Sequence, residues 1–243
     1  MQHAVAREIM RDAEYVEEDV HWRRHLAYFS SVHAGDGFAI VGDAAAFMDP
    51  FYSPGMDWIS FTATSAANLV TRQRNGEAME EQVARYNRDF TVSHQRWFSS
   101  LYKDKYQYIG EYDLLGLAFR LDLSLYYWGV VEPPFREGIS ALLAPPFSPP
   151  SGRVFAGLMS LYNKRFAAIA CRRRELGLLG KMNKDHRLLI PGFTLERKDM
   201  FRLFGMLREW AVLEIREGWH TWSRLAPKPR PTPITAVPET AQP

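Results

Sequence analysis

The clearest pattern along the chain is a series of mostly apolar residues spaced three and four apart between residues 79 and 101. Such spacing places side chains on one face of an α-helix. The pattern therefore predicts a long amphipathic helix with one buried face. The members of the series are Met79, Val83, Tyr86, Phe90, His94, Trp97 and Leu101.

Further helices are predicted on both sides of this one. Asn75-Gly76 should end the helix that precedes it, because glycine readily adopts the backbone conformation of a helix C-terminus. Small residues at Ala63, Ala66 and Ala67 favour close packing of that helix on a neighbour. The expected helices cover residues 5–24, 56–74, 102–128 (as one or two helices), 152–178 and 198–219, the last with Met200, Leu203, Leu207 and Trp210 on one face.

Two short strands are predicted at residues 26–29 and 38–41, with a turn at residues 33–37 between them. The glycines and Asp36 of the turn tolerate unusual backbone angles. The second strand is apolar throughout, which indicates burial on both faces. Pro133-Pro134 and the proline-rich run 145–150 are expected to interrupt the helical part.

Composition narrows the class of protein. The chain has 243 residues, of which 47% are hydrophobic and 24% charged, so it can form a sizeable core. A formal net charge of +2 is too small to indicate a nucleic-acid partner. A single cysteine, Cys171, forms no internal disulfide, and no zinc-ligand spacing is present. We therefore expect a cytoplasmic protein without a metal site.

The sequence also argues against export or insertion into a membrane. The polar, partly acidic N-terminus does not resemble a signal peptide. No uninterrupted apolar run reaches the roughly 18 residues that a spanning helix requires. We therefore expect no transmembrane segment.

The residues that carry chemistry cluster around the second predicted strand. The strand ends in Gly42-Asp43, and Asp49-Pro50 follows within a loop. Glycine permits close approach of the backbone to a ligand, and an acidic side chain after a strand can accept hydrogen bonds from sugar-like hydroxyls. Ser53-Pro54-Gly55 then turns into a helix whose free N–H groups suit an anion or an electron-rich ring edge.

This ordered segment resembles the second FAD motif of the flavin monooxygenase superfamily, in the branch of flavin-dependent halogenases and geranylgeranyl reductase-like enzymes. The match covers residues 37–70, about a seventh of the chain. The resemblance implies that Asp43 binds the ribityl chain of FAD and that Pro50 lies against the isoalloxazine ring. It implies that the N–H groups of Gly55 and Met56 face the pyrimidine edge. The implied cofactor site therefore comprises Gly42, Asp43, Asp49, Pro50, Gly55 and Met56.

The resemblance also implies a fold class, an α/β remnant plus a mostly α part. Residues 1–76 would be the C-terminal piece of a Rossmann-type FAD-binding domain. Residues 77–225 would form a helical cap or substrate region, and residues 226–243 a disordered proline-rich tail. The family's first motif, Gly-x-Gly-x-x-Gly, is absent from the sequence. We expect the N-terminal half to have been cut away, lost from the gene, or placed on another polypeptide, and FAD binding by this chain alone to be poor.

The expected activity is that of an FAD-dependent oxidoreductase, monooxygenase-like or halogenase-like, acting on a small-molecule or carrier-bound organic substrate. Reduction of an isoprenoid double bond is an alternative within the same family. A different class is also open, namely a non-catalytic helical interaction module derived from such an enzyme. No catalytic acid or base is assigned.

Several residues outside the motif have a structural and a functional interpretation. Asp57 either stabilises the start of its helix or points at substrate. His94 is more simply a core histidine than a catalytic one, and the spacing of His21 and His25 is a weak metal signal. Cys171 is read as a small buried hydrophobe. Tyr102, Tyr106, Tyr108, Tyr112 and Trp97 either line an aromatic pocket or form core, and Arg172–Arg174 are read as a solvated helix end rather than a partner-binding patch.

Overall fold

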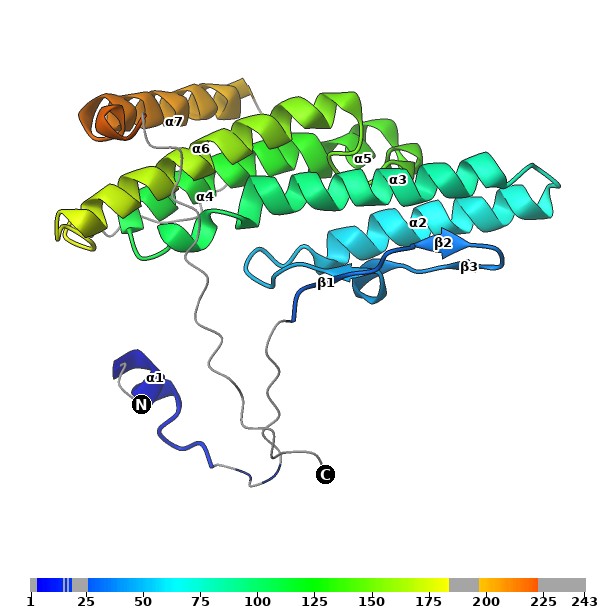
Figure 1. Cartoon of the computed structure of the whole chain (residues 1–243), viewed down its shortest axis with the longest axis horizontal. Coiled ribbons are helices and arrows are strands. Elements are labelled where there is room, and N and C mark those ends of the chain that lie inside the picture. Colours follow the sequence, from blue (N-terminus) through cyan, green and yellow to red (C-terminus); the bar gives the residue numbers. More distant parts are fainter. Residues whose placement is uncertain (1–3, 15, 17, 19–25, 184–196, 223–243) are drawn as a thin grey trace.

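Helices dominate the computed structural model, which describes residues 4–14, 16, 18, 26–183 and 197–222 (Figure 1). The helices are α1 (Ala4–Ile9), α2 (Gly55–Arg74), α3 (Glu80–Trp97), α4 (Tyr112–Tyr126), α5 (Glu132–Glu137), α6 (Pro150–Glu175) and α7 (Arg197–Arg216). The strands are β1 (Tyr28–Phe29), β2 (Ala34–Gly35), β3 (Phe38–Ala39) and β4 (Ala46–Phe47). Short 3₁₀ turns cover Gly42–Ala44, Lys105–Gln107, Ile139–Leu143 and Gly218–Thr221, and π-helical turns cover Phe98–Tyr102 and Tyr127–Val131.

The described strands form two antiparallel pairs. β1 pairs with β4 and β2 pairs with β3, and the second pair is a hairpin that turns at Asp36-Gly37. The predicted turn is therefore confirmed, but a Rossmann-type parallel sheet is not. Burial of the second strand on both faces was a wrong prediction, because Phe38 is 50% exposed. A two-stranded hairpin leaves one face of such a strand without a covering layer.

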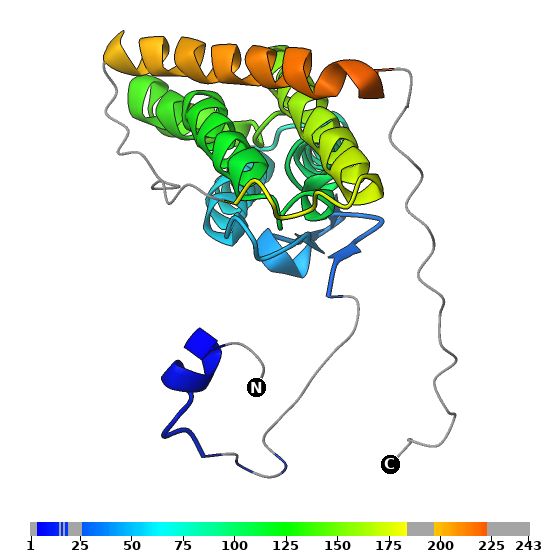
Figure 2. The same ribbon diagram turned by 90° about the vertical axis from the view of Figure 1, so that its left-hand side faces the viewer.

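Helices α2 to α6 form a bundle with the strands on one side and α7 on the other (Figures 1 and 2). Helix α6 contacts α3 and α4, and α4 also contacts α7. The periodic face predicted for α3 is confirmed, since Phe90 and Trp97 are buried. They join Leu121 of α4 and Met159 of α6 in one core. The face predicted for α7 is also confirmed where described, because Leu203, Leu207 and Trp210 pack against this core.

Helices α4 and α5 are continuous, so the break predicted at Pro133-Pro134 is wrong. The π-helical turn Tyr127–Val131 joins them, and the prolines occupy the first turn of α5, where a missing N–H is tolerated. By length and composition alone, Tyr112–Glu137 is apolar enough to cross a membrane. It is packed within the bundle, and 44% of its most apolar window is buried. The break predicted at 145–150 is confirmed.

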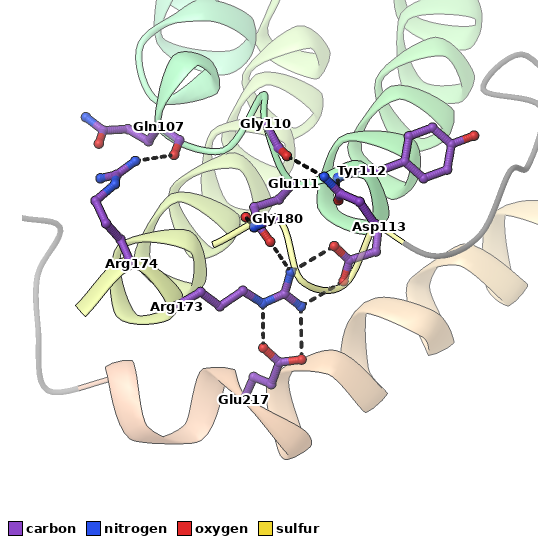
Figure 3. A network of polar contacts seen from close by, with 10 residues as sticks. Gln107, Gly110, Glu111, Tyr112, Asp113, Arg173, Arg174, Gly180 and Glu217 are labelled. Carbon is purple, nitrogen blue, oxygen red and sulfur yellow. Dashed lines mark hydrogen bonds and ion pairs between the residues drawn. The ribbon is translucent and has the colours of Figure 1, made fainter. Parts of the chain in front are cut away.

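An ion cluster around the buried Arg173 joins α6 to the start of α4 and to the residue that follows α7 (Figure 3). Its guanidinium donates to Glu111 at 2.7 Å, to Asp113 at 2.7 Å and to Glu217 at 2.8 Å. Burial alone would lower the pKa of Arg173, but these carboxylates raise it above its ordinary value. Arg173 is only 2% exposed, so the prediction of a solvated helix end is wrong for this residue. Arg174 is exposed and donates to the carbonyl of Gln107 at 3.3 Å.

Other expectations are corrected or lie outside the described residues. The predicted helix at 5–24 ends at Ile9, residues 10–12 form a turn, and residues 13 and 14 are irregular. Helix α2 and its end at Asn75-Gly76 are confirmed, and Gly76 has a φ of 76°. Ala63 and Ala67 are exposed, so they provide no close packing here. The predicted tail at 226–243 lies outside the described residues, as do His21 and His25.

Candidate functional site

Gly42 is buried at the junction between the strand region and α2. Its φ is 54°, a left-handed conformation that favours glycine. Its N–H donates to Oγ1 of Thr62 at 2.8 Å. A Cβ at this position would lie 2.7 Å from Cγ1 of Ile59. The close approach that Gly42 permits is therefore to helix α2, a packing reason that the sequence motif does not reveal.

Asp43 follows in the 3₁₀ turn and lies beside the start of α2. Its side chain is exposed, and its backbone carbonyl accepts a hydrogen bond from the hydroxyl of Tyr28. A Cβ built on Gly55 would lie 3.6 Å from Oδ1 of Asp43. The structure thus brings Asp43 and Gly55 together, twelve residues apart in the sequence, with the carboxylate open to solvent.

The N-terminus of α2 leaves backbone donors available. Pro54 is the N-cap residue and makes no side-chain cap hydrogen bond. The first N–H groups of a helix have no partner within the helix, so those of Gly55 and Met56 are unsatisfied by any cap. Met56 is 74% exposed, and Ser53 before the helix has a φ of 50°. The turn therefore presents N–H donors at an accessible surface next to Asp43.

Asp49 and Pro50 form the loop that leads to this helix. Oδ1 of Asp49 accepts the N–H of Phe51 at 2.8 Å, and the hydroxyl of Tyr106 donates to Oδ2 at 2.8 Å. The carbonyl of Pro50 accepts the N–H of Ser53 at 3.0 Å. Asp49 is thus used to shape the loop and to tie it to the helical region, whereas the ring of Pro50 is exposed.

The same loop is hydrogen-bonded to a buried polar network in the helical core, which the sequence did not predict. Tyr52 donates to Oδ2 of Asp122 at 2.6 Å, and the ammonium of Lys105 lies 2.5 Å from the same oxygen. Oδ1 of Asp122 accepts from Tyr162 at 2.5 Å and from Asn163 at 3.3 Å. Asp122 is therefore a carboxylate with four donors, enclosed in the core.

Burial governs the electrostatics of this network. Lys105 is 0% exposed and Asp122 is 2% exposed. Burial lowers the pKa of Lys105, and the Asp122 carboxylate opposes this shift. Burial raises the pKa of Tyr52, and Asp122 raises it further, so the Tyr52 hydroxyl remains a donor. A charged residue between Leu121 and Leu123 was the one signal in the sequence that could have indicated this network.

Asp57, in the first turn of α2, faces inward. Its carboxylate accepts a hydrogen bond from the hydroxyl of Tyr126. Burial raises the pKa of Asp57, and this hydrogen bond opposes the shift. Both side chains border a cavity of about 50 Å³, together with Tyr52, Pro54, Trp97, Leu101, Asp122 and Leu123. A cavity of this size is too small for an organic substrate.

Comparison with known proteins shows partial similarity to fungal enzymes. A sulochrin halogenase of Aspergillus terreus is 34% identical over 79 residues, which are 32% of this chain and 14% of that protein. A flavin-dependent halogenase of Malbranchea aurantiaca is 46% identical over 50 residues, 21% of this chain and 8% of that protein. Part of this chain is halogenase-like. The resemblance inferred from the motif is therefore confirmed.

The halogenase-like similarity has a limited extent. A flavin-dependent halogenase of Pestalotiopsis fici is 31% identical over 83 residues, 34% of this chain and 15% of that protein. The chain thus spans about a seventh or less of the length of these three relatives. No family model matches the chain, and no solved structure matches it.

Two larger cavities lie within the described part of the chain. One of about 630 Å³ is bordered by Phe61 of α2, Trp128 of the π-helical turn and Phe155 of α6, with Arg136 and Glu132 at its polar side. Its size suits a drug-sized organic molecule. Another, of about 460 Å³, lies between the β2–β3 hairpin and the facing parts of α2 and α3.

The remaining candidates are mostly structural. Trp97, Tyr102 and Tyr108 are buried in the core, whereas Tyr106 is exposed and holds Asp49. His94 lies in an aromatic cluster, and its Nε2 is buried without a partner among the described residues. Cys171 is a half-buried free thiol. Among the described residues, no group of histidine, cysteine or acidic side chains is placed to hold a metal ion.

Proposed function

We propose that this chain provides the ring-facing part of an FAD site in a halogenase-like oxidoreductase that acts on an organic small molecule. The observation that carries the proposal is the uncapped N-terminus of α2 beside the exposed Asp43 carboxylate. Donors from the helix start would stabilise negative charge at the pyrimidine edge of a reduced flavin. The similarity to enzymes named flavin-dependent halogenases supports the same cofactor.

The described residues fit one end of the cofactor. Asp43 would accept hydrogen bonds from ribityl hydroxyls, and the exposed ring of Pro50 would lie against the isoalloxazine. Gly55 has no side chain, so nothing stands between the helix start and Asp43. A Cβ at this position would lie 3.6 Å from Oδ1 of Asp43. When bound, the flavin supplies the redox chemistry. The protein holds the loop rigid through Asp49, Tyr52 and Asp122.

We propose that a dinucleotide-binding part outside these 243 residues completes the site. Exposed apolar side chains at Met56, Ile59 and Val70 follow one side of α2, next to the strands. Both strand pairs have only two members and therefore unpaired edges among the described residues. A further α/β part packed there would cover the helix face and extend the sheet.

The substrate is proposed to enter the 630 Å³ cavity. Phe61, at its border, is six residues along α2 from Gly55, about 9 Å along the helix axis. Aromatic side chains at Trp128 and Phe155 would pack against an aromatic substrate. Ala141→Phe should narrow this cavity and raise KM for the substrate without changing the flavin content.

The decisive experiment is the visible absorbance spectrum of the purified protein, alone and after co-expression with a Gly-x-Gly-x-x-Gly partner encoded upstream. Bound flavin in the co-expressed sample is the expected result. Asp43→Ala should lower the flavin content, whereas Asp36→Ala, an exposed aspartate in the neighbouring hairpin, should not. Equal flavin in both variants would contradict the proposed role of Asp43. A stable but flavin-free complex would instead favour the interaction module.

A further inference from the structure

Helix α7 carries apolar side chains on two opposite faces. Its inner face includes Met206, which is buried, with Leu207 and Trp210 packed on the bundle core. Its outer face carries large side chains that no part of the described chain covers. These exposed residues are Phe201, Phe204, Val212, Ile215 and Trp219, hereafter the outer stripe.

The outer stripe follows the helical repeat. Steps of three, four, seven and eight residues between its members keep them on one side of α7 and of the short turn that follows it. Ile215 is 78% exposed and Trp219 is 72% exposed. Exposed aromatics at this density are unusual for a surface helix and indicate a contact surface.

Ion pairs hold α7 in one orientation about its own axis, so the outer stripe faces away from the core. Glu209 pairs with Arg120 of α4 at 2.6 Å, and Glu214 pairs with Arg165 of α6 at 2.9 Å. Glu217, just beyond the helix, pairs with Arg173 at 2.8 Å (Figure 3). All three carboxylates are therefore paired with arginines of the bundle.

The outer face of α7 is consequently positive. Arg208 lies within the outer stripe, one turn from both Phe204 and Val212, and Arg216 flanks it beside Ile215; both arginines are exposed. The acidic residues of the helix for which side chains are described all point to bundle arginines. The outer face thus combines aromatics, aliphatics and cations, the composition of helices that lie in a membrane interface.

We propose that this outer face docks on an anionic lipid surface. A second copy of the chain is a poorer occupant, because a symmetric contact would bring Arg208 and Arg216 of both copies together without carboxylates to offset them. The proposed flavin part is placed elsewhere, since α7 and the strands lie on opposite sides of the bundle (Figures 1 and 2). A lipid surface accepts the whole length of an outward-facing helix and supplies negative charge.

The first test is co-sedimentation of the full chain with phosphatidylcholine vesicles, with and without phosphatidylserine. Binding to the phosphatidylserine vesicles is expected. The triple variant Phe204→Ser, Ile215→Ser, Trp219→Ser should abolish this binding. A matched control, Phe135→Ser, Ile139→Ser, Val154→Ser, removes equally exposed side chains from α5, the following turn and α6 and should bind as the wild type does. Circular dichroism melts verify that both variants fold.

The charge is tested separately. Arg208→Gln, Arg216→Gln should weaken binding to phosphatidylserine vesicles roughly twenty-five-fold, the product of about fivefold for each arginine near an anionic surface. Arg74→Gln, Arg153→Gln, which changes two exposed arginines elsewhere, should have a much smaller effect. The proposal is overturned by absent vesicle binding, by equal loss in stripe and control variants, or by equal binding with and without phosphatidylserine. It is also overturned if the stripe variant only converts a dimer to a monomer.

Discussion

Tyr52 of the motif loop donates a 2.6 Å hydrogen bond to Asp122 of helix α4, seventy residues further along the chain. This bond joins the exposed loop to a carboxylate in the core. Asp49 makes a second attachment, through the exposed hydroxyl of Tyr106. The loop that we propose to hold the flavin ring is therefore positioned by the helical region and not by the strands alone. Rigid support of this kind is what a binding loop requires.

Tyr52→Phe should loosen the loop and destabilise the protein by about 2 kcal/mol, because it removes a hydrogen bond to a buried charged group. Equilibrium urea denaturation measures this change. Tyr127→Phe is the matched control, since within the described residues no hydrogen bond is assigned to the Tyr127 hydroxyl. Equal stability of the two variants would show that the Tyr52–Asp122 bond does not hold the loop.

Lys105 and Asp122 should behave as a coupled buried pair. Lys105→Met leaves the Asp122 carboxylate enclosed without its cation, which should cost about 3 to 5 kcal/mol. Asp122→Asn should also destabilise, because it leaves the ammonium uncompensated. In a double-mutant cycle, the double variant should lose less stability than the sum of the two single losses.

An exposed pair provides the comparison for that cycle. At the surface, a guanidinium nitrogen of Arg136 lies 2.6 Å from Oε1 of Glu137, and solvent screens their attraction. The cycle with Arg136→Met and Glu137→Gln should give no measurable coupling. A coupling as large as that of Lys105 and Asp122 would mean that burial is not what makes the latter pair strong.

Gly42→Ala should destabilise the protein by two separable effects. The φ of 54° penalises any side chain, and the new Cβ would meet Ile59 at 2.7 Å. Together these should cost about 2 to 4 kcal/mol. Gly37→Ala is the control: its φ is 75°, but nothing lies within 4 Å of its Cβ position, so only the backbone cost of about 1 kcal/mol remains. Equal melting temperatures would contradict the packing role of Gly42.

The sequence predicted the parts of this fold whose signals are local. The periodicity of Phe90 and Trp97 marks the buried face of α3, and Asn75-Gly76 marks the end of α2, because both depend on neighbouring residues only. The order of Gly42, Asp43 and Asp49-Pro50 identified the loop for the same reason, although its role toward a cofactor stays a proposal.

What the sequence did not reveal depends on contacts between distant elements. Lys105 and Asp122 are 17 residues apart and meet because the turn that carries Lys105 and helix α4 both pack against α6. Arg173 lies in a basic run that is typical of a solvated helix end, but it is buried and forms ion pairs with three carboxylates from other segments. Pro133 sits in a continuous helix because a π-helical turn precedes it, and no local pattern indicates such a turn.

His94 should make the stability of the protein depend on pH. Its ring lies 4.4 Å from that of Phe29, and burial, with a smaller effect of His33, lowers its pKa from 6.5 to about 4. Between these values the unfolded chain binds a proton that the folded chain does not. The free energy of unfolding should therefore fall as the pH falls from 6.5 toward 4. His94→Phe keeps an aromatic ring and removes the titrating group, so it should flatten this slope in urea denaturation series. In the variant, His33, whose pKa is also lowered by burial, still contributes to the slope, and Asp57, whose pKa burial raises, opposes it. His220→Gln, at an exposed histidine, should leave the slope as it is in the wild type. A slope unchanged by His94→Phe would mean that the imidazole is protonated or solvated in the folded protein.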